Sequence, residues 1–483
     1  MAGVIKSVSN PGISLNILSS EDVKRLHTAT LDVIERTGVK FPSQRALDIW
    51  QAHGAEVDRG SQIVKVPSQV IEKALKQAPP SYTLAARGPE QDLPLDGNHV
   101  YAATDGCGVE VLDLYTGQRR RSCLQDQADI ARVADFLPEI GFHWIAVSAQ
   151  DYPAETRSLH ELRVTWENST KHVQTESVYS VAEAQAAVEM AAAVAGGREA
   201  LRNRPVLSIM QCTLPPLGHD GGSLDAALIA AEAGLPVGFM TMTSCASSAP
   251  ATLAGNLIVG NAEVISALAL IQLAYPGAPV FYAAAQTATD IRSGAYTGGG
   301  PEDYLFGAAT NVLADFYNVP LSMGSFATGA KTPNWQAGID NSMSTFMASI
   351  AMSDMLLGVG LLHGSRIWSY SQMLLDCEIF DMVIQTLQGI QVDEESMALE
   401  VIDRVGPGNH FLGQKHTRKH MRELWLPNYM DRRPYDEWEE KGDGAVDWAV
   451  AEAKRILETH QPDELDSQLI EELKRICTSV ELA

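Results

Sequence analysis

Short apolar segments rich in β-branched residues recur eight times in the middle of the chain, and longer segments rich in Ala and Leu lie between them. This alternation predicts parallel strands joined by crossover helices. The predicted strands are His99–Thr104, Trp144–Ala149, His172–Thr175, Val206–Cys212, Val237–Thr243, Val280–Ala285, Leu321–Phe326 and Leu356–Leu362. Eight such units favour an α/β fold, a closed (β/α)8 TIM-type barrel.

An open, doubly wound sheet is the main alternative fold. It would be supported by a GxGxxG segment after a strand. The nearest sequence, Gly358-Val359-Gly360, continues as Leu361-Leu362-His363 and lacks the third glycine. The closed barrel is therefore the preferred prediction.

Helices are predicted between the strands and on both sides of the barrel. Those between the strands are Leu124–Phe136, Ser158–Asn168, Val181–Ala195, Asp220–Ala233, Ala251–Ala274, Pro301–Tyr317 and Asn334–Met352. The flanking segments have apolar residues at helical spacing. We expect a helical N-terminal extension over residues 1–97, the barrel over 98–365, and a C-terminal helical region over 366–483 packed on the barrel.

The composition excludes several classes of protein. A net charge of −24 argues against a nucleic-acid partner, because phosphate binding needs clustered Lys and Arg. No run of 18 apolar residues and no secretion signal is present, so we expect a cytoplasmic protein that does not bind a membrane. The six cysteines, including Cys107, form no CxxC pair and are expected to be reduced.

Familiar catalytic motifs are missing from the sequence. GxSxG, HExxH and the P-loop pattern do not occur. His416 and His420 share a helix face and could bind a metal together. However, Arg418, Lys419 and Arg422 crowd the same turns and disfavour a cation. A structural or interaction role for these histidines is the preferred interpretation, and no metal site is predicted.

A TIM barrel builds its active site from the residues at the carboxyl ends of its strands. Many of the residues at these positions are amides and hydroxyls, and few are basic. They are Tyr101, Asp105, Gln150, Asp151, Glu176, Gln211, Thr243, Ser244, Gln286, Thr287, Phe326 and His363. Aromatic residues also gather near predicted strand ends, among them Trp144, Trp335, Trp368 and Tyr370. A quaternary ammonium has no N–H group and binds to the faces of such rings.

The C-terminal part of the chain resembles the trimethylamine methyltransferase family. The similarity is carried by Gly406–Thr417 (GPGNHFLGQKHT) with His420 and Arg422, and by Leu426-Pro427, Asp431-Arg432 and Trp438. Leu31–Val39 and Gln336-Ala337-Gly338 are similar to the family as well. The resemblance implies a (β/α)8 barrel that moves a methyl group from a methylamine to the Co(I) corrinoid (cobalamin) of a separate protein.

The family's founding members carry pyrrolysine near the segment that corresponds to residues 324–331, where this chain has standard residues only. The chain therefore resembles the branch that acts on quaternary amines, with glycine betaine first and proline betaine, carnitine or another betaine as alternatives. Such a nitrogen leaves as a neutral amine without prior protonation, so no acid or nucleophile is needed from the protein. No DxHxxG corrinoid-binding motif occurs, so the cofactor is expected on a partner.

We predict that His363 and Phe326 are catalytic. The predicted substrate-binding residues are Tyr101, Gln211, Gln286, Arg366, Trp368 and Tyr370. We also expect a homo-oligomer. Two other functions stay open: a betaine-binding protein without catalysis on the same barrel, and another barrel enzyme with a metal held by strand-end residues such as Asp105, Glu176 and His363.

Overall fold

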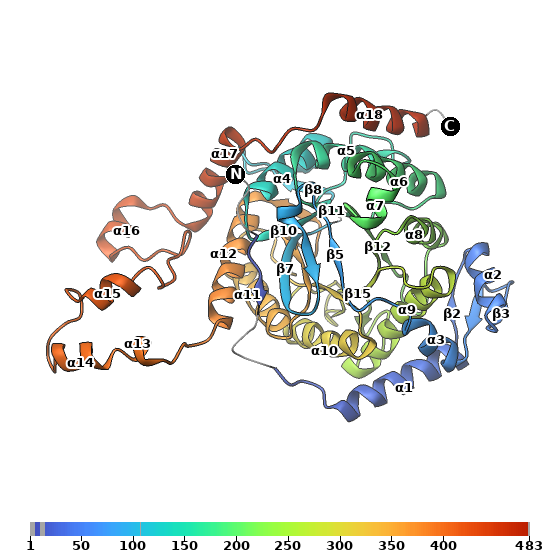
Figure 1. The fold of residues 1–483 in the computed structure, drawn as a ribbon, viewed down its shortest axis with the longest axis horizontal. Helices are drawn as coiled ribbons and strands as arrows, with labels where there is room; N and C mark the ends of the chain where they lie inside the picture. Colours follow the sequence, from blue (N-terminus) through green and yellow to red (C-terminus); the bar gives the residue numbers. More distant parts are fainter. Residues whose placement is uncertain (1–4, 10–14, 107, 482–483) are drawn as a thin grey trace.

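Eight parallel strands close into a barrel in the computed structural model, which describes residues 5–9, 15–106 and 108–481. In order around the barrel they are β7 (His99–Thr104), β10 (Ile140–Trp144), β11 (His172–Thr175), β12 (Leu207–Cys212), β13 (Val237–Thr241), β15 (Val280–Ala284), β17 (Leu321–Gly324) and β18 (Met355–Val359). Strand β18 pairs with β7 and closes the sheet. The predicted TIM-type barrel is confirmed (Figure 1).

A helix follows each barrel strand and covers the outside of the barrel (Figure 1). These helices are α4 (Leu124–Phe136), α5 (Arg157–Asn168), α6 (Val181–Ala195), α8 (Gly221–Ala233), α9 (Leu253–Ala274), α10 (Pro301–Tyr317), α11 (Trp335–Ile350) and α12 (Tyr370–Leu387). A short helix, α7 (Arg198–Asn203), follows α6. The barrel unit thus runs from β7 to α12, and its eighth helix lies beyond residue 365.

The predicted position of the second barrel strand is wrong. The structure has it at Ile140–Trp144, where it pairs with β7 and β11, and not at Trp144–Ala149. The apolar run after Trp144 is buried and continues without regular pairing, except for a bridge between Val147 and Gly108. Burial alone therefore made this segment look like a strand.

The N-terminal extension contains strands as well as the predicted helices. Its helices are α1 (Ser20–Arg36), α2 (Gln44–Ala52) and α3 (Ser68–Leu75). A small sheet is formed by β2 (Val39–Lys40), β4 (Ile63–Lys65) and β3 (Glu56–Asp58), and a hairpin by β5 (Tyr82–Leu84) and β6 (Leu93–Leu95). These strands of two or three residues are too short to show a period in the sequence.

The β5–β6 hairpin closes one end of the barrel. Leu84, Leu93 and Leu95 pack in one cluster with the interior residues Tyr101 and Phe142. Tyr101 lies near the start of β7, so the hairpin covers the amino ends of the strands. The opposite, carboxyl end is left as the barrel's mouth.

On β7 and β15 the interior side chains become smaller toward the mouth. Along β7 they change from Tyr101 to Ala103, and along β15 from Phe281 to Ala283 and then Ala285. On β17, a Cβ at Gly324 would lie 2.8 Å from the Ala285 Cβ, so a glycine is needed there. On these strands, small side chains thus lie at the carboxyl end and large ones fill the amino half of the barrel.

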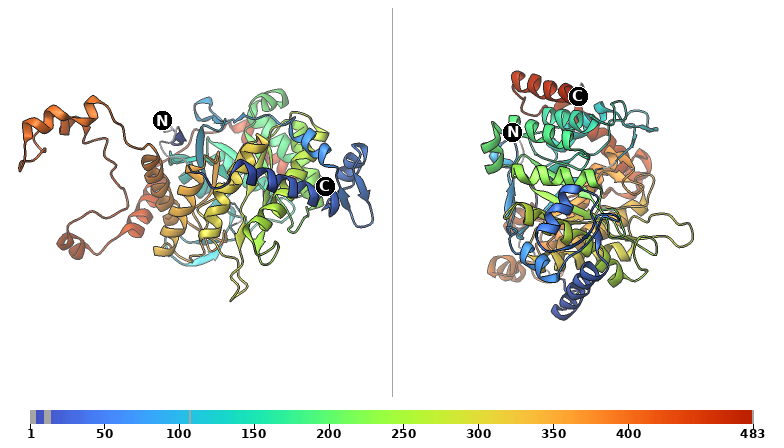
Figure 2. Two further views of the ribbon diagram at one scale, coloured as in Figure 1. Left: turned by 90° about the horizontal axis from the view of Figure 1, so that it is seen from below. Right: turned by 90° about the vertical axis from the view of Figure 1, so that its right-hand side faces the viewer.

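The C-terminal region leaves the barrel and returns to it. After α12 come α13 (Glu394–Met397), α14 (Leu399–Val405), α15 (Lys415–His420) and α16 (Tyr435–Lys441), which project to one side of the barrel (Figures 1 and 2). The chain then returns as α17 (Ala445–Thr459), packed on α12 and α4, and α18 (Ser467–Glu481), packed on α6 and α5.

Helix α9 is long and apolar enough to cross a membrane by length and composition. In this fold, 78% of its most apolar window is buried. It packs against α1, α3 and the strands β13 and β15. Its apolar composition is therefore accounted for by packing in the interior.

Candidate functional site

The mouth of the barrel is built around Asp105, the residue that follows β7. Its carboxylate accepts a hydrogen bond from the backbone N–H of Gly106 at 2.9 Å and one from the Ser365 hydroxyl at 2.5 Å. A Cβ at Gly106 would lie 2.5 Å from the Trp144 ring, so the indole packs directly against this loop. Trp144 is buried, and its Nε1–H has no hydrogen-bond partner among the described residues.

A second carboxylate, Glu176, follows β11 at the same end of the barrel. The thiol of Cys212, at the end of β12, donates to its Oε2 at 3.7 Å. Burial raises the pKa of Asp105 to about 7, and the charge of Glu176 raises it as well, while the Ser365 hydrogen bond lowers it. Two buried acidic groups that affect each other are typical of a functional site, and an approaching cation would stabilise their ionised forms.

Ser365 reaches Asp105 from a strained turn. The turn joins β19 (Leu361–Leu362) to β20 (Ile367–Ser369), two short strands that continue the chain after β18. His363, Gly364 and Ser365 have φ angles of 56°, 61° and 63°. Left-handed backbone costs roughly 1–2 kcal/mol for each residue with a side chain, and such strain concentrates at functional sites.

Positive charge surrounds His363 in this turn. Burial lowers the pKa of His363, and the nearby cations Lys331, Arg366 and Arg119 lower it further, while the charge of Glu110 raises it. Arg366 is exposed. The mouth therefore has two buried carboxyl groups in its interior, Asp105 and Glu176, and one turn joins Asp105 to an edge that carries Arg366 and Lys331.

Exposed apolar side chains follow three neighbouring strands at the mouth. They are Leu214 after β12, Met242 after β13, and Ile291 and Tyr296 after β15, with exposed fractions of 57%, 39%, 88% and 44%. Ile291 and Tyr296 belong to a narrow loop, yellow-green in Figure 2, that projects from the barrel in both views. The ring of Tyr296 lies 2.8 Å from the position of a Cβ on Gly364, so this loop touches the strained turn.

Two of the predicted site residues, His363 and Arg366, lie together at the mouth. Tyr101 lies at the other end of the barrel, where its ring stacks on His99 at 5.9 Å. Phe326 is only 1% exposed and packs in the main hydrophobic cluster outside the barrel. Trp368 and Tyr370 pack edge to face in the same cluster, with ring centroids 6.4 Å apart.

The two predicted glutamines lie behind the barrel wall. Gln211 donates to the backbone carbonyl of Val178 at 2.9 Å. Gln286 donates to Asn256 at 2.8 Å and accepts from Thr310 at 3.1 Å, which ties β15 to α9 and α10. Both are buried, and the Gln211 Oε1 has no hydrogen-bond partner among the described residues. The sequence predicted that Asp105, Glu176 and Trp144 lie near strand ends. It did not predict that the three lie close together at the mouth.

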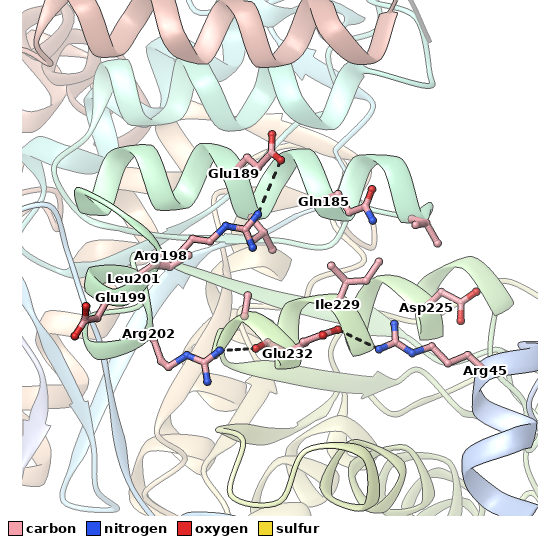
Figure 3. A pocket seen from close by; sticks show the side chains of 13 residues that line it. Arg45, Gln185, Glu189, Arg198, Glu199, Leu201, Arg202, Asp225, Ile229 and Glu232 are labelled. Atoms are coloured by element: carbon pink, nitrogen blue, oxygen red, sulfur yellow. Dashed lines mark hydrogen bonds and ion pairs between the residues drawn. The ribbon is translucent and has the colours of Figure 1, made fainter.

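A separate surface cavity of about 920 Å³ lies among α6, α7, α8 and α2 (Figure 3). Two of its arginines form ion pairs: Arg45 with Glu232 at 3.2 Å, and Arg198 with Glu189 at 4.0 Å. Arg202 donates to the backbone carbonyl of Glu232 at 2.8 Å. The cavity is lined by three arginines and four acidic residues, so its net charge is small.

The histidines of the C-terminal motif contact each other, Glu423 and the backbone of α13. His416 and His420 have ring centroids 4.3 Å apart, and His420 bonds Glu423 at 2.8 Å. Among the described residues, no group of three or more His, Cys, Asp or Glu side chains has a geometry that could hold a metal ion. His416 also contacts the backbone carbonyl of Glu395 at 3.1 Å, so the pair links α15 to α13.

The fold is a TIM barrel with two buried carboxyl groups, Asp105 and Glu176, and the Trp144 indole at the carboxyl end of its strands. The family model for trimethylamine methyltransferases (MTTB) matches residues 2–478. The chain therefore belongs to the trimethylamine methyltransferase family, as its C-terminal motif suggested.

Two relatives illustrate the range of the family. Trimethylamine methyltransferase MttB of Desulfitobacterium hafniense DCB-2 is 33% identical over 473 residues, which cover 97% of this chain and 95% of the relative. The glycine betaine methyltransferase of Desulfitobacterium hafniense Y51 is 34% identical over 457 residues, covering 94% and 95%. The chain is about equally similar to proteins named for a tertiary and for a quaternary amine.

The fold is also found in a solved methyltransferase structure. The monomethylamine methyltransferase (MtmB) of Methanosarcina barkeri matches with a TM-score of 0.53, covering 92% of this chain and 88% of that one. The sequence identity is 11%, so this match supports the barrel alone.

Proposed function

We propose that this protein transfers a methyl group from a small quaternary amine, glycine betaine first, to the Co(I) corrinoid of a separate protein. The observation that carries the proposal is the pair of buried acidic residues, Asp105 and Glu176, at the mouth of a barrel that belongs to a methyltransferase family. A relative 34% identical to the chain is named a glycine betaine methyltransferase. A cytoplasmic location is part of the same proposal.

The donor's cation would lie between the two carboxylates and the Trp144 ring. A quaternary ammonium cannot donate hydrogen bonds, so it is bound by negative charge and by the faces of aromatic rings. Buried carboxylates attract it more strongly than exposed ones do, because less water screens them. The small residues Ala103, Ala285 and Gly324 leave space for its methyl groups.

A carboxylate on the donor would meet the cationic edge of the mouth. Arg366, with Lys331 nearby, lies in or beside the turn that also holds Ser365 against Asp105. A betaine carries its positive and negative charges a few bonds apart, which matches a site with an anionic interior and a cationic edge. His363 and Arg366 thus keep their predicted substrate-facing roles in this proposal.

In the reaction, the C–N bond of one methyl group breaks and its electron pair stays on the nitrogen, which leaves as a neutral tertiary amine. The acceptor's Co(I) supplies the electron pair for the new bond to carbon. The chain's own residues bind the cation, orient one methyl group outward and exclude water. The exposed rim formed by Leu214, Met242 and Ile291 offers apolar surface that the acceptor could cover.

The test is a donor panel with free reduced cobalamin as the acceptor. We expect the Co(I) spectrum to change to that of methyl-Co(III) with glycine betaine, and more slowly with choline, which lacks the carboxylate. Arg366→Ala should remove this preference for the carboxylated donor. Binding of glycine betaine without any change in the cobalamin spectrum would instead support a non-catalytic betaine-binding protein, and no response to the whole panel would refute the proposal.

A further inference from the structure

The segment that follows β10 leaves the barrel sheet but stays inside the protein. The ladder between β10 and β11 ends at Trp144, which is paired with Gln174. We call residues 145–149 the post-β10 segment; its side chains are buried except for the partly buried Ser148. Buried backbone groups need hydrogen-bond partners, and here a regular strand ladder no longer supplies them.

Side chains of two adjacent helices supply part of these partners. The Oε1 of Gln127, on α4, accepts hydrogen bonds from the backbone N–H groups of Ala146 at 3.1 Å and Val147 at 3.2 Å. The Oε1 of Glu161, on α5, accepts one from the N–H of Ala149 at 2.7 Å. Two side chains thus take the place that the backbone of a neighbouring strand would have.

The amide of Gln127 is itself held on its other side. Gln127 is fully buried, and its Nε2 donates to the Thr165 hydroxyl at 2.9 Å and to the His143 Nε2 at 2.7 Å. Burial lowers the pKa of His143 to about 3, so the ring is neutral and one of its nitrogens can accept. The orientation of Gln127 is therefore fixed by partners on both of its polar atoms.

The post-β10 segment runs beside the loop that carries Asp105. The N–H of Ser148 donates to the Gly108 carbonyl at 2.7 Å, and the N–H of Gly108 donates to the Ala146 carbonyl at 3.1 Å. The position of the segment therefore sets where Trp144 lies relative to the Asp105 loop.

The Trp144 indole has no polar anchor of its own among the described residues. Its Nε1–H is buried there without a hydrogen-bond partner. The ring packs on Gly106, where a Cβ would lie 2.5 Å from it. The orientation of the ring thus depends on this packing and on the backbone that follows Trp144.

We propose that Gln127 and Glu161 are positioning residues of the donor site: they hold the post-β10 segment from behind and so fix the Trp144 ring against the Asp105 loop. The inference rests on the proposed function, in which this ring and the Asp105 carboxyl group bind the donor's cation. Gln127 and Glu161 are fully buried on the helices outside the barrel, so they act through Trp144 and do not touch the donor. Misplacement of a group by about 1 Å can cost an enzyme about a hundredfold in rate.

Fluorine NMR of the full chain tests the positioning directly. The eight tryptophans are replaced by fluorotryptophan, and Trp144→Phe assigns the Trp144 resonance. We expect Gln127→Leu and Glu161→Leu to shift this resonance, because the segment behind the ring loses its acceptors. Glu161→Gln keeps an acceptor oxygen and should restore the wild-type signal. This measurement needs no donor, so it gives an answer even if no quaternary amine is a substrate.

Kinetics with glycine betaine and free reduced cobalamin tests the consequence for the site. Gln127→Leu should raise the KM for glycine betaine by about tenfold and leave the KM for cobalamin unchanged. A loss of folded protein would lower the apparent kcat without changing either KM, which separates positioning from general destabilisation.

Gln272→Leu is the matched control. Gln272, on α9, is also fully buried, donates to the Ala278 carbonyl at 2.8 Å and accepts from the Gly277 N–H at 2.9 Å. It lies before β15, at the amino end of the barrel. We expect a similar loss of stability, with no change in the Trp144 resonance or in the KM for glycine betaine.

Thr165→Val is a milder variant that preserves the test if a Leu variant does not fold. It removes the hydroxyl that accepts from Gln127 and should shift the Trp144 resonance in the same direction by less. A wild-type resonance and donor KM in Gln127→Leu, Glu161→Leu and Thr165→Val, or equal changes in Gln272→Leu, would overturn the proposal. Shifted resonances in a protein without methyl transfer would support the positioning of Trp144 and refute the proposed function alone.

Discussion

Asp105 has a carboxyl group that can change its charge near neutral pH, because burial raises its pKa to about 7. Glu176 adds to the shift, and the Ser365 hydroxyl opposes it. A cation at the mouth stabilises the ionised form, so binding of the cation and loss of the proton are linked. This makes the binding of a quaternary amine sensitive to pH near neutrality.

Binding of glycine betaine should therefore strengthen by about tenfold between pH 6 and pH 8, the change in the ionised fraction of a group with a pKa of about 7. Asp105→Asn should weaken binding at pH 8 and flatten this dependence. Ser365→Ala removes a hydrogen bond that favours the ionised form, so the midpoint should move to higher pH. Calorimetry across the pH range measures the affinity of the wild type and of both variants for glycine betaine. If Asp105→Asn had the same pH profile as the wild type, another group would be the one that titrates.

At the scale of elements, one buried lysine joins three parts of the barrel. The Nζ of Lys171, which precedes β11, donates to the backbone carbonyls of Ala134, Leu137 and Ile140, each at 2.6 Å. These carbonyls belong to the end of α4, its connection, and the start of β10. The lysine thus satisfies acceptors that the end of a helix leaves without partners.

Replacing Lys171 by Met should lower the free energy of unfolding by about 3 kcal/mol, because buried carbonyls lose their donor. Lys24→Met, at an exposed position on α1, is the matched control and should change stability little. Urea unfolding followed by circular dichroism measures both variants. If Lys171→Met and Lys24→Met had equal free energies of unfolding, water would replace the Lys171 ammonium group as a donor without loss of stability.

The sequence predicted the barrel well because buried parallel strands and amphipathic helices leave strong patterns. Seven of the eight strands lie where the pattern places them; β10 does not, since the apolar run after Trp144 stays buried beyond the end of the strand. The meeting of Asp105 with Ser365 could not be foreseen, because it depends on closure of the barrel by β18 and on a left-handed turn. Tyr101 and Phe326 have suitable chemistry, but local sequence does not reveal which way their side chains face.

For the whole molecule, burial raises the pKa of many carboxyl groups. The values are about 7 for Asp105, Glu263, Asp303 and Asp376, about 6 for Asp354, and about 8 for Glu161. A group whose pKa is raised in the folded state stabilises the fold fully below its unfolded pKa, and this stabilisation is lost as the pH rises through the folded pKa. The net charge of −24 adds repulsion in the same direction.

The free energy of unfolding should therefore fall between pH 5 and pH 9. We expect a decrease of at least about 4 kcal/mol, the effect of one carboxyl group titrating three units above its ordinary value. Glu161→Gln should remove part of the decrease between pH 5 and about pH 8, because an uncharged side chain remains at that position while the pH rises through the raised pKa of Glu161. Urea unfolding at each pH measures the curve, and stability that rises from pH 5 to pH 9 would contradict this interpretation of the buried groups.

The central claim is that a methyl group leaves a quaternary amine at the mouth of this barrel and is transferred to cobalt. The most direct measurement supplies glycine betaine with deuterated methyl groups, reduced cobalamin and the wild-type protein, and follows both products by mass spectrometry. The account predicts one deuterated methyl group on cobalamin for each dimethylglycine formed, and loss of both products with Asp105→Asn. Dimethylglycine without methylated cobalamin, or neither product from any quaternary amine tested, would contradict it.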